Sequence, residues 1–214
     1  QTVLIGTMDT DSGTVIYYGD DSYTLGFAIS DISDEYYDLE IDSESGTGSW
    51  TISGLISVTN DLLINSGSVI LSADTTLYSD SDSDGQGYLN MVSGASLDAD
   101  NNSLTIYSSE DSNLGHLLNI DTLTIYESYS GSGMTYTLSQ NLSVDTFRLE
   151  SGTFYSDPNS VSFSAIDFSI TEGSTGGTFK RFISGDGTSS SPYQIGDVYS
   201  LQSLESYDYL SSHY

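Results

Sequence analysis

Apolar and polar residues alternate in short runs along most of this chain. Clear examples are residues 103–107, 122–126 and 135–138, where Leu, Ile or Tyr alternates with Ser or Thr. Gly, Asn or Asp flanks each run, and a period of two with such boundaries predicts short, half-buried β-strands. No stripe with helical periodicity precedes residue 195. The pattern therefore predicts an all-β fold.

Four Ser-Gly pairs each precede a short alternating run, an Asx-rich turn and a second run. Their glycines are Gly13, Gly67, Gly94 and Gly152, which stand 54, 27 and 58 residues apart, close to multiples of 27 to 29. A fixed spacing with a shared turn predicts stacked coils of two or three strands, that is, a parallel β-helix (β-solenoid). The alternative is a β-sandwich, whose strands also recur about every 8 to 12 residues.

The C-terminal part of the chain has a different character, so we divide the chain into residues 1–182 and 183–214. Residues 184–192 are rich in Gly and Ser and indicate a linker. Beyond it, Val198, Leu201 and Leu204 predict one short amphipathic helix with Asp197 as its N-cap. Residues 1–182 are expected to form the solenoid, and residues 183–214 a linker plus either the start of a further repeat module or a capping segment.

This C-terminal segment carries a family resemblance. Residues 185–195 (GDGTSSSPYQI), followed by 201–204 (LQSL) and 210–214 (LSSHY), resemble a segment of large prokaryotic surface proteins. In those proteins it precedes GLUG-type or filamentous-haemagglutinin-like β-helical repeats, and upstream phrases such as 63–69 (LINSGSV) resemble adhesin and autotransporter-passenger coils. The resemblance implies an extracellular, structural or adhesive role and supplies no catalytic residues.

The charge of the chain excludes several classes of protein. There are 31 acidic and 3 basic residues, a formal net charge of −28, and no cysteine. Without a basic stripe the chain cannot neutralise phosphates or anionic lipid, so we expect no nucleic-acid partner. No apolar run approaches the roughly 20 residues that cross a bilayer, so we expect no membrane insertion. An acidic chain that begins at Gln1 suits a processed protein in a salty or calcium-rich exterior, and we expect secretion or cell-surface location.

One acidic stretch has the spacing of a calcium loop. Asp80, Asp82 and Asp84 alternate with serines before Gly85, which places several oxygens around one hard cation. The match is incomplete because Met91 stands where such loops have a bidentate Glu. The stretch is thus either a calcium site or a solvated acidic turn.

The leading functional hypothesis is a non-enzymatic extracellular structural subunit or module, such as a surface layer, sheath, fibre or adhesin stalk, that self-associates through solenoid contacts. The alternative is a carbohydrate-binding or polysaccharide-cleaving β-helix protein that recognises surface glycans, and a simple spacer is a third possibility. Cleavage would require a base, for which Arg148, Lys180 and Arg181 are the available cations. Aromatic residues suited to stacking on sugar rings are Tyr17, Tyr18, Tyr36, Tyr37, Trp50, Tyr126, Tyr129 and Tyr136.

Overall fold

The fold is known from a computed structural model of the whole chain. The structure describes residues 12–24, 36–79, 87–128, 133–173, 176–206, 209 and 214, with the backbone alone for residues 53–55. Neither helix in these ranges has the length and apolar character that crossing a bilayer requires.

The described chain is all-β, and its strands pair in parallel into two sheets. Sheet A contains, in spatial order, β1 (Thr14–Tyr18), β3 (Asp38–Asp42), β5 (Leu62–Ile64), β7 (Leu89–Met91), β10 (Ser112–Leu114), β13 (Thr135–Leu138), β15 (Thr153–Tyr155) and β17 (Thr178–Lys180). Sheet B contains β2 (Ser22–Thr24), β4 (Ser49–Val58), β6 (Ser68–Ser79), β8 (Ser96–Asp98), β9 (Leu104–Ser108), β11 (His116–Leu118), β12 (Ile120–Glu127), β14 (Leu142–Leu149) and β16 (Phe163–Ile170). Two helical turns follow, α1 (Val198–Gln202) and η1 (Ser203–Glu205).

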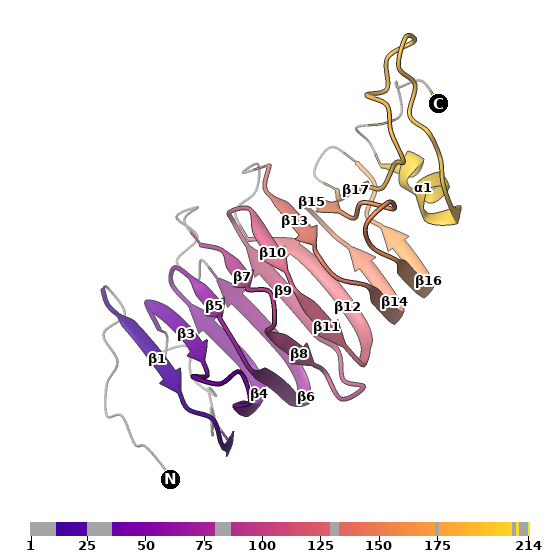
Figure 1. Cartoon of the computed structure of the whole chain (residues 1–214). Coiled ribbons are helices and arrows are strands. Elements are labelled where there is room, and N and C mark those ends of the chain that lie inside the picture. Colours follow the sequence, from indigo (N-terminus) through magenta and orange to yellow (C-terminus); the bar gives the residue numbers. More distant parts are fainter. Residues whose placement is uncertain are drawn as a thin grey trace.

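The chain visits the two sheets in turn, so that each pass adds a layer to both. Figure 1 shows the strands stacked in sequence order along the long axis, from β1 at one end to β16 and β17 at the other. All-β architecture is thereby confirmed, and the arrangement is consistent with a solenoid. It differs from the β-sandwich alternative because sandwich sheets pair antiparallel.

Inward-facing side chains form ladders because paired residues in successive layers point to the same side. In sheet A, Leu39 pairs with Leu62 and Leu62 with Leu89. In sheet B one ladder runs through Leu77, Ile106, Ile125, Leu149 and Ile170. The members of both ladders are buried except Ile170 in the last layer, which is half-buried. The core is one continuous cluster along the stack.

The Ser-Gly turns do not occupy one equivalent position, which differs from the repeat that the sequence predicts. Gly13 and Gly152 precede strands of sheet A, whereas Gly67 and Gly94 precede strands of sheet B. All four have positive φ, from 76° to 104°, so the turn chemistry was predicted correctly. Paired residues in successive layers lie between 18 positions apart (Tyr136 and Phe154) and 29 apart (Thr75 and Leu104). The layers therefore differ in length and do not follow the uniform spacing of 27 to 29 residues that the sequence predicts.

The C-terminal helix exists, but its buried face was predicted wrongly. Asp197 is the N-cap, because its carboxylate accepts a 2.7 Å hydrogen bond from the Ser200 N–H, which confirms that prediction. Val198 and Leu201, the expected inward face, are 58% and 56% exposed. Tyr199 and Ser200 face the strand stack instead, and the Tyr199 hydroxyl bonds to Ala165 on the open edge of β16.

Candidate functional site

The possible calcium loop lies outside the described residues, as Asp80, Asp82 and Asp84 all do. Within the described ranges, no group of three or more His, Asp or Glu side chains is arranged to hold a metal ion. Calcium binding at 80–84 therefore stays a prediction.

Three of the eight aromatic residues singled out for sugar stacking belong to the core. Trp50, Tyr36 and Tyr136 are 1%, 4% and 0% exposed, so none presents a ring face to solvent. Trp50 stacks on Tyr23, with ring centroids 5.9 Å apart. These three residues are not available to a glycan. Tyr129 lies outside the described residues.

Three tyrosines form a ladder on the outer face of sheet B. The rings of Tyr78 and Tyr107 stack with centroids 4.7 Å apart, and those of Tyr107 and Tyr126 with centroids 4.6 Å apart. Burial, followed by the neighbouring tyrosines, raises the pKa of Tyr107. Since Tyr107 is covered on both faces and Tyr78 and Tyr126 on one face each, the ladder is a poor platform for a sugar ring.

A groove crosses the outer face of sheet A near its C-terminal end; we call it the threonine groove. Its floor is the outward ladder formed by Thr135, Thr153 and Thr178, which pair in register. Its volume is about 420 Å³. Beside the floor, the ammonium group of Lys180 lies 5.7 Å from the ring centroid of Tyr155, a cation–π contact.

The far wall of the threonine groove comes from the C-terminal segment. Tyr193 and Tyr209 line it, and both pack on Phe182: Tyr193 is stacked with a centroid distance of 4.2 Å, and Tyr209 meets it edge-on at 5.0 Å. Partial burial raises the pKa of Tyr193. Aromatic wall, hydroxyl floor and one ammonium group together suit a polar ligand with an apolar face, as a sugar ring has.

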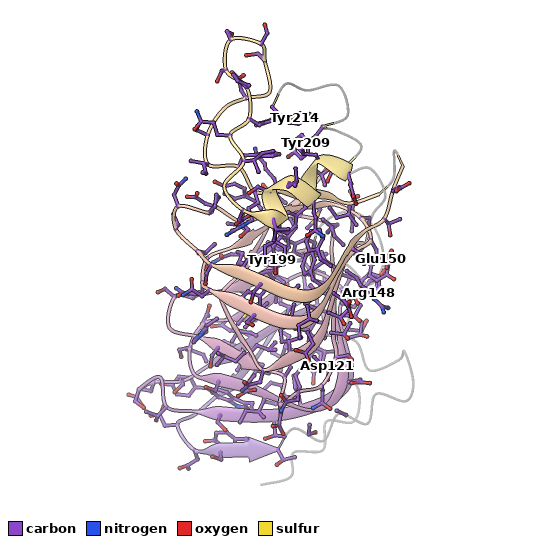
Figure 2. All side chains as sticks on the ribbon, turned by 90° about the vertical axis from the view of Figure 1, so that its right-hand side faces the viewer. Asp121, Arg148, Glu150, Tyr199, Tyr209 and Tyr214 are labelled. Carbon is purple, nitrogen blue, oxygen red and sulfur yellow. The ribbon has the colours of Figure 1, made fainter. Side chains whose placement is uncertain are left out.

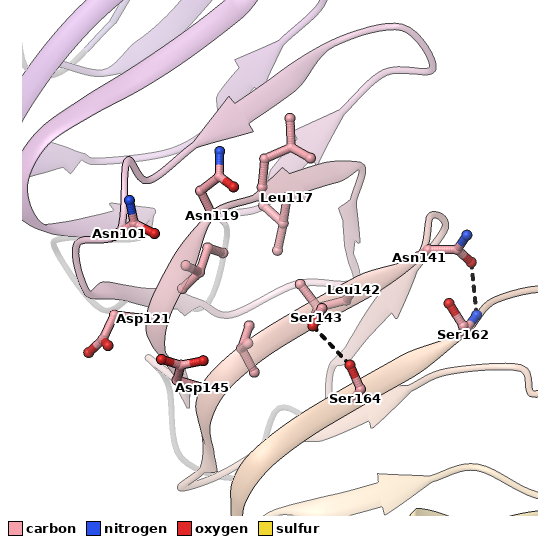
Figure 3. A pocket seen from close by; sticks show the side chains of 13 residues that line it. Asn101, Leu117, Asn119, Asp121, Asn141, Leu142, Ser143, Asp145, Ser162 and Ser164 are labelled. Carbon is pink, nitrogen blue, oxygen red and sulfur yellow. Dashed lines mark hydrogen bonds between the residues drawn. The ribbon is translucent and has the colours of Figure 1, made fainter.

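A second hollow, of about 430 Å³, lies where layers of sheet B begin (Figure 3). Its polar lining includes Asn101 and Asn119, both in the left-handed conformation, and the carboxylates of Asp121 and Asp145. The Asn141 side-chain oxygen is already occupied, because it accepts a 2.9 Å hydrogen bond from the Ser162 N–H. The hollow has no aromatic wall, so it is less suited to a sugar than the threonine groove.

The three candidate bases are not brought together. Arg181 is buried, and its Nε donates a 2.8 Å hydrogen bond to Asp197. Lys180 lies at the threonine groove, whereas Arg148 extends from the exposed face of β14, on the side labelled with Glu150 in Figure 2.

Comparison with protein-family models, with curated proteins and with solved structures found no match for this chain.

Asp61, directly before β5 in the interior of sheet A, occupies an electrostatically unfavourable place, which leads to a testable prediction. Partial burial, followed by the charges of Asp38 and Glu110, raises its pKa to about 6, although hydrogen bonds from Tyr88 act in the opposite direction. A carboxyl group with a raised pKa favours folding below its unfolded-state pKa and loses that contribution as pH rises through the folded-state value. We expect Asp61→Asn to raise the free energy of unfolding at pH 7.5 by roughly 1 kcal/mol, after discounting for partial solvent screening.

Urea denaturation at pH 7.5 and pH 4 measures this effect. The gain from Asp61→Asn should shrink toward zero at the lower pH, where Asp61 of the parent chain is protonated. Asp167→Asn, which removes an equal charge from an exposed position on β16, is the matched control and should show little pH dependence. If Asp61→Asn raised the free energy of unfolding equally at both pH values, the raised pKa of Asp61 would be contradicted.

Proposed function

We propose that the chain is a closed parallel β-helix that serves as a non-enzymatic structural module at the cell exterior, in a fibre, sheath, surface layer or adhesin stalk. The observation that carries this proposal is the unbroken stacking of layers around one core, from β1 to β17. Such a stack is quasi-one-dimensional: it extends by adding layers, and each layer contacts only its neighbours.

The outer surface supports the same proposal. Thr76, Thr105 and Thr124 form an outward ladder on sheet B, as the threonine groove does on sheet A. Hydroxyl ladders give a solvated surface without ion pairs, and a net charge of −28 keeps such rods apart until counterions screen them. We propose that calcium at residues 80–84 provides part of that screening and promotes self-association.

Negative-stain electron microscopy with and without millimolar calcium tests this proposal. Rods that associate into fibres, tubes or sheets with calcium are the expected result. A variant carrying Asn at Asp80, Asp82 and Asp84 should lose the calcium response. A control carrying Asn at the exposed positions Asp121, Asp145 and Asp167 has the same net charge and should keep it. Dispersed particles under every condition would rule out a self-assembling subunit.

A second candidate function is recognition of a neutral saccharide, and the threonine groove favours it. Its volume of about 420 Å³ falls within the roughly 300–1,000 Å³ typical of small-molecule sites. The tyrosines offer apolar contact, while the threonine hydroxyls and Lys180 offer hydrogen bonds. A neutral sugar is the expected ligand, because one ammonium group does not offset the repulsion between an anionic glycan and a chain of charge −28.

Saturation-transfer NMR with glucose, galactose, N-acetylglucosamine and their dimers tests this candidate. We expect Thr153→Val, which replaces a floor hydroxyl by a methyl group, to weaken any binding about tenfold, since a polar contact is worth roughly 1–1.5 kcal/mol. Thr105→Val makes the same exchange on the outer face of sheet B and should leave binding unchanged. Equal effects of the two variants, or no transfer to any of the sugars, would rule out the groove as a saccharide site.

A further inference from the structure

Both sheets end in a strand with one open edge at the C-terminal end of the stack. In a parallel strand the backbone groups of alternate residues point to opposite sides. The carbonyl of Ser162, just before β16, accepts a hydrogen bond from the Leu142 N–H and so points toward the preceding layer. Ala165 lies three residues further along, so its backbone N–H and carbonyl point away from the stack. In β17 the Lys180 carbonyl accepts from the Ser156 N–H, so its neighbour Phe179 likewise faces away. Such outward edge groups are the template on which another strand pairs.

A single hydroxyl group occupies the edge of β16. The hydroxyl of Tyr199, in α1, accepts a 2.9 Å hydrogen bond from the Ala165 N–H and donates a 2.9 Å hydrogen bond to the Ala165 carbonyl. It thus satisfies both backbone groups of Ala165, which are among those that a further strand would use. Figure 2 shows α1 lying across the C-terminal end of the stack, with Tyr199 directed toward the strands.

The edge of β17 is occupied in the same manner from the next turn of the chain. The Phe179 N–H donates a 3.1 Å hydrogen bond to the side-chain oxygen of Ser206, which directly follows η1. Ser206 and Phe179 are both buried. One C-terminal segment therefore occupies backbone groups on the outward edges of both sheets, at Ala165 and Phe179, with side-chain hydroxyls in place of a strand.

Ring packing and a buried ion pair hold the segment in this place. The Tyr199 ring meets Phe163 edge-on at a centroid distance of 5.0 Å and lies 5.7 Å from Phe168. Arg181 joins Asp197, the N-cap of α1, to the loop after β15, through hydrogen bonds to the Ser156 hydroxyl at 2.7 Å and the Ser156 carbonyl at 3.4 Å. The position of the helix is thus determined by contacts with the last two layers.

We propose that residues 181–206 are an end cap that prevents a second copy of this chain from pairing with the C-terminal edges of β16 and β17. The cap excludes a strand of another copy of this chain, because the open edges of β16 and β17 have the same parallel pairing pattern by which each layer pairs with the next. Any self-association of the native protein then proceeds through another surface. The cap acts on these edges alone, whether or not the native protein forms fibres through another surface.

The test uses the double variant Tyr199→Phe/Ser206→Ala in the full chain. Both changes keep the core filled and remove only the hydroxyls that occupy the edges. Hydrogen exchange should be about fivefold faster or more at the Ala165 and Phe179 amides, because each amide loses a hydrogen bond worth roughly 1 kcal/mol. Sedimentation velocity should show concentration-dependent association beyond that of the parent chain.

Tyr107→Phe/Ser96→Ala is the matched control, since it removes a tyrosine and a serine hydroxyl from outward positions on strands away from the open edges. It should match the parent chain in both measurements. Unchanged exchange in the double variant would overturn the assignment of the cap. Faster exchange without added association would overturn the role in excluding a second copy. Fibre formation by the parent chain is scored separately, so a failure of the proposed function does not alter this result.

Discussion

Replacement of Phe147 by alanine is expected to lower the free energy of unfolding by about 3 to 5 kcal/mol, the range for a fully buried aromatic ring. Phe147, in β14, is 0% exposed and sits at the centre of an aromatic cluster. Four rings surround it at centroid distances of 4.9 to 5.7 Å, those of Phe154, Phe163, Phe168 and Phe179. These rings come from both sheets, so the cavity left behind cannot collapse by the shift of one strand.

Phe168→Ala is the matched control, because Phe168 is the partner of Phe147 in the last layer of sheet B and is only half-buried. Its loss should cost roughly half as much, since part of its ring already contacts solvent. Urea denaturation followed by far-UV circular dichroism gives both values. A larger cost for Phe168 than for Phe147 would contradict the placement of Phe147 at the centre of the cluster.

The single tryptophan adds a second probe of the same variants. Trp50 is buried in β4, near the opposite end of the stack from Phe147. Because each layer contacts only its neighbours, unfolding can spread from a weakened end without reaching the other end at once. We expect Phe147→Ala to shift the circular-dichroism transition to lower urea than the Trp50 fluorescence transition.

The fold class could be read from the sequence because the period-two pattern is local. In the run 103–107, the apolar residues Leu104 and Ile106 are the ones that point into the core, and the same holds for Leu123 and Ile125 in 122–126. Alternation decides which side of a strand is buried whatever its partner is. The sequence therefore predicts β-strands and their inward residues.

The stacking of strands could not be read in the same way, because turns of different lengths join them. Gly67 is an example. Its positive φ is a local property of the turn, but glycine is required there because of the preceding layer. A Cβ atom there would lie 2.5 Å from the carbonyl oxygen of Gly48. A Ser-Gly pair signals a turn without saying which sheet follows it, so turns before sheet A and before sheet B were aligned as one repeat.

The candidate site was missed for a related reason. Tyr193 and Tyr209 belong to the C-terminal segment, and only tertiary packing places them opposite Tyr155. The available signal was the repeated pattern Thr-Phe-Tyr at 153–155 and Thr-Phe-Lys at 178–180, whose outer residues share one face of the sheet. In α1, apolar periodicity suggested a buried face of Val198 and Leu201, but the open edge of β16 required hydrogen-bonding groups, which Tyr199 supplies.

Arg181→Met is expected to cost about 2 to 4 kcal/mol of unfolding free energy, because it removes one partner of a largely buried ion pair while keeping the side-chain volume. The Arg181 side chain is 5% exposed and that of Asp197 is 30% exposed. The guanidinium group also donates to the Ser156 hydroxyl at 2.7 Å and to the Val161 carbonyl at 3.2 Å, and both would lose this donor. The value lies at the lower end of the range for buried pairs because Asp197 keeps solvent contact and its hydrogen bonds from Ser200.

The pH dependence of this cost identifies its cause. Partial burial acts to raise the pKa of Asp197, but hydrogen bonds from Ser200 and Arg181 outweigh it and hold the pKa below its usual value. A carboxylate with a lowered pKa stabilises the fold above its unfolded-state pKa and loses that contribution as pH falls through the folded-state value. The difference between Arg181→Met and the parent chain should therefore narrow in acid, as urea titrations at pH 7 and near pH 3 would show.

Arg148→Met provides the matched control, because it removes the same charge from the exposed face of β14, where Arg148 has no ion pair with a described residue. Its effect should stay within about 0.5 kcal/mol at either pH. Equal costs for the two substitutions would mean that Arg181 acts only through the net charge of an acidic chain. A large, pH-dependent loss of unfolding free energy that is confined to Arg181→Met would have a different meaning. It would show that the contacts of Arg181 with Asp197, Ser156 and Val161 hold α1 against the last layers of the stack.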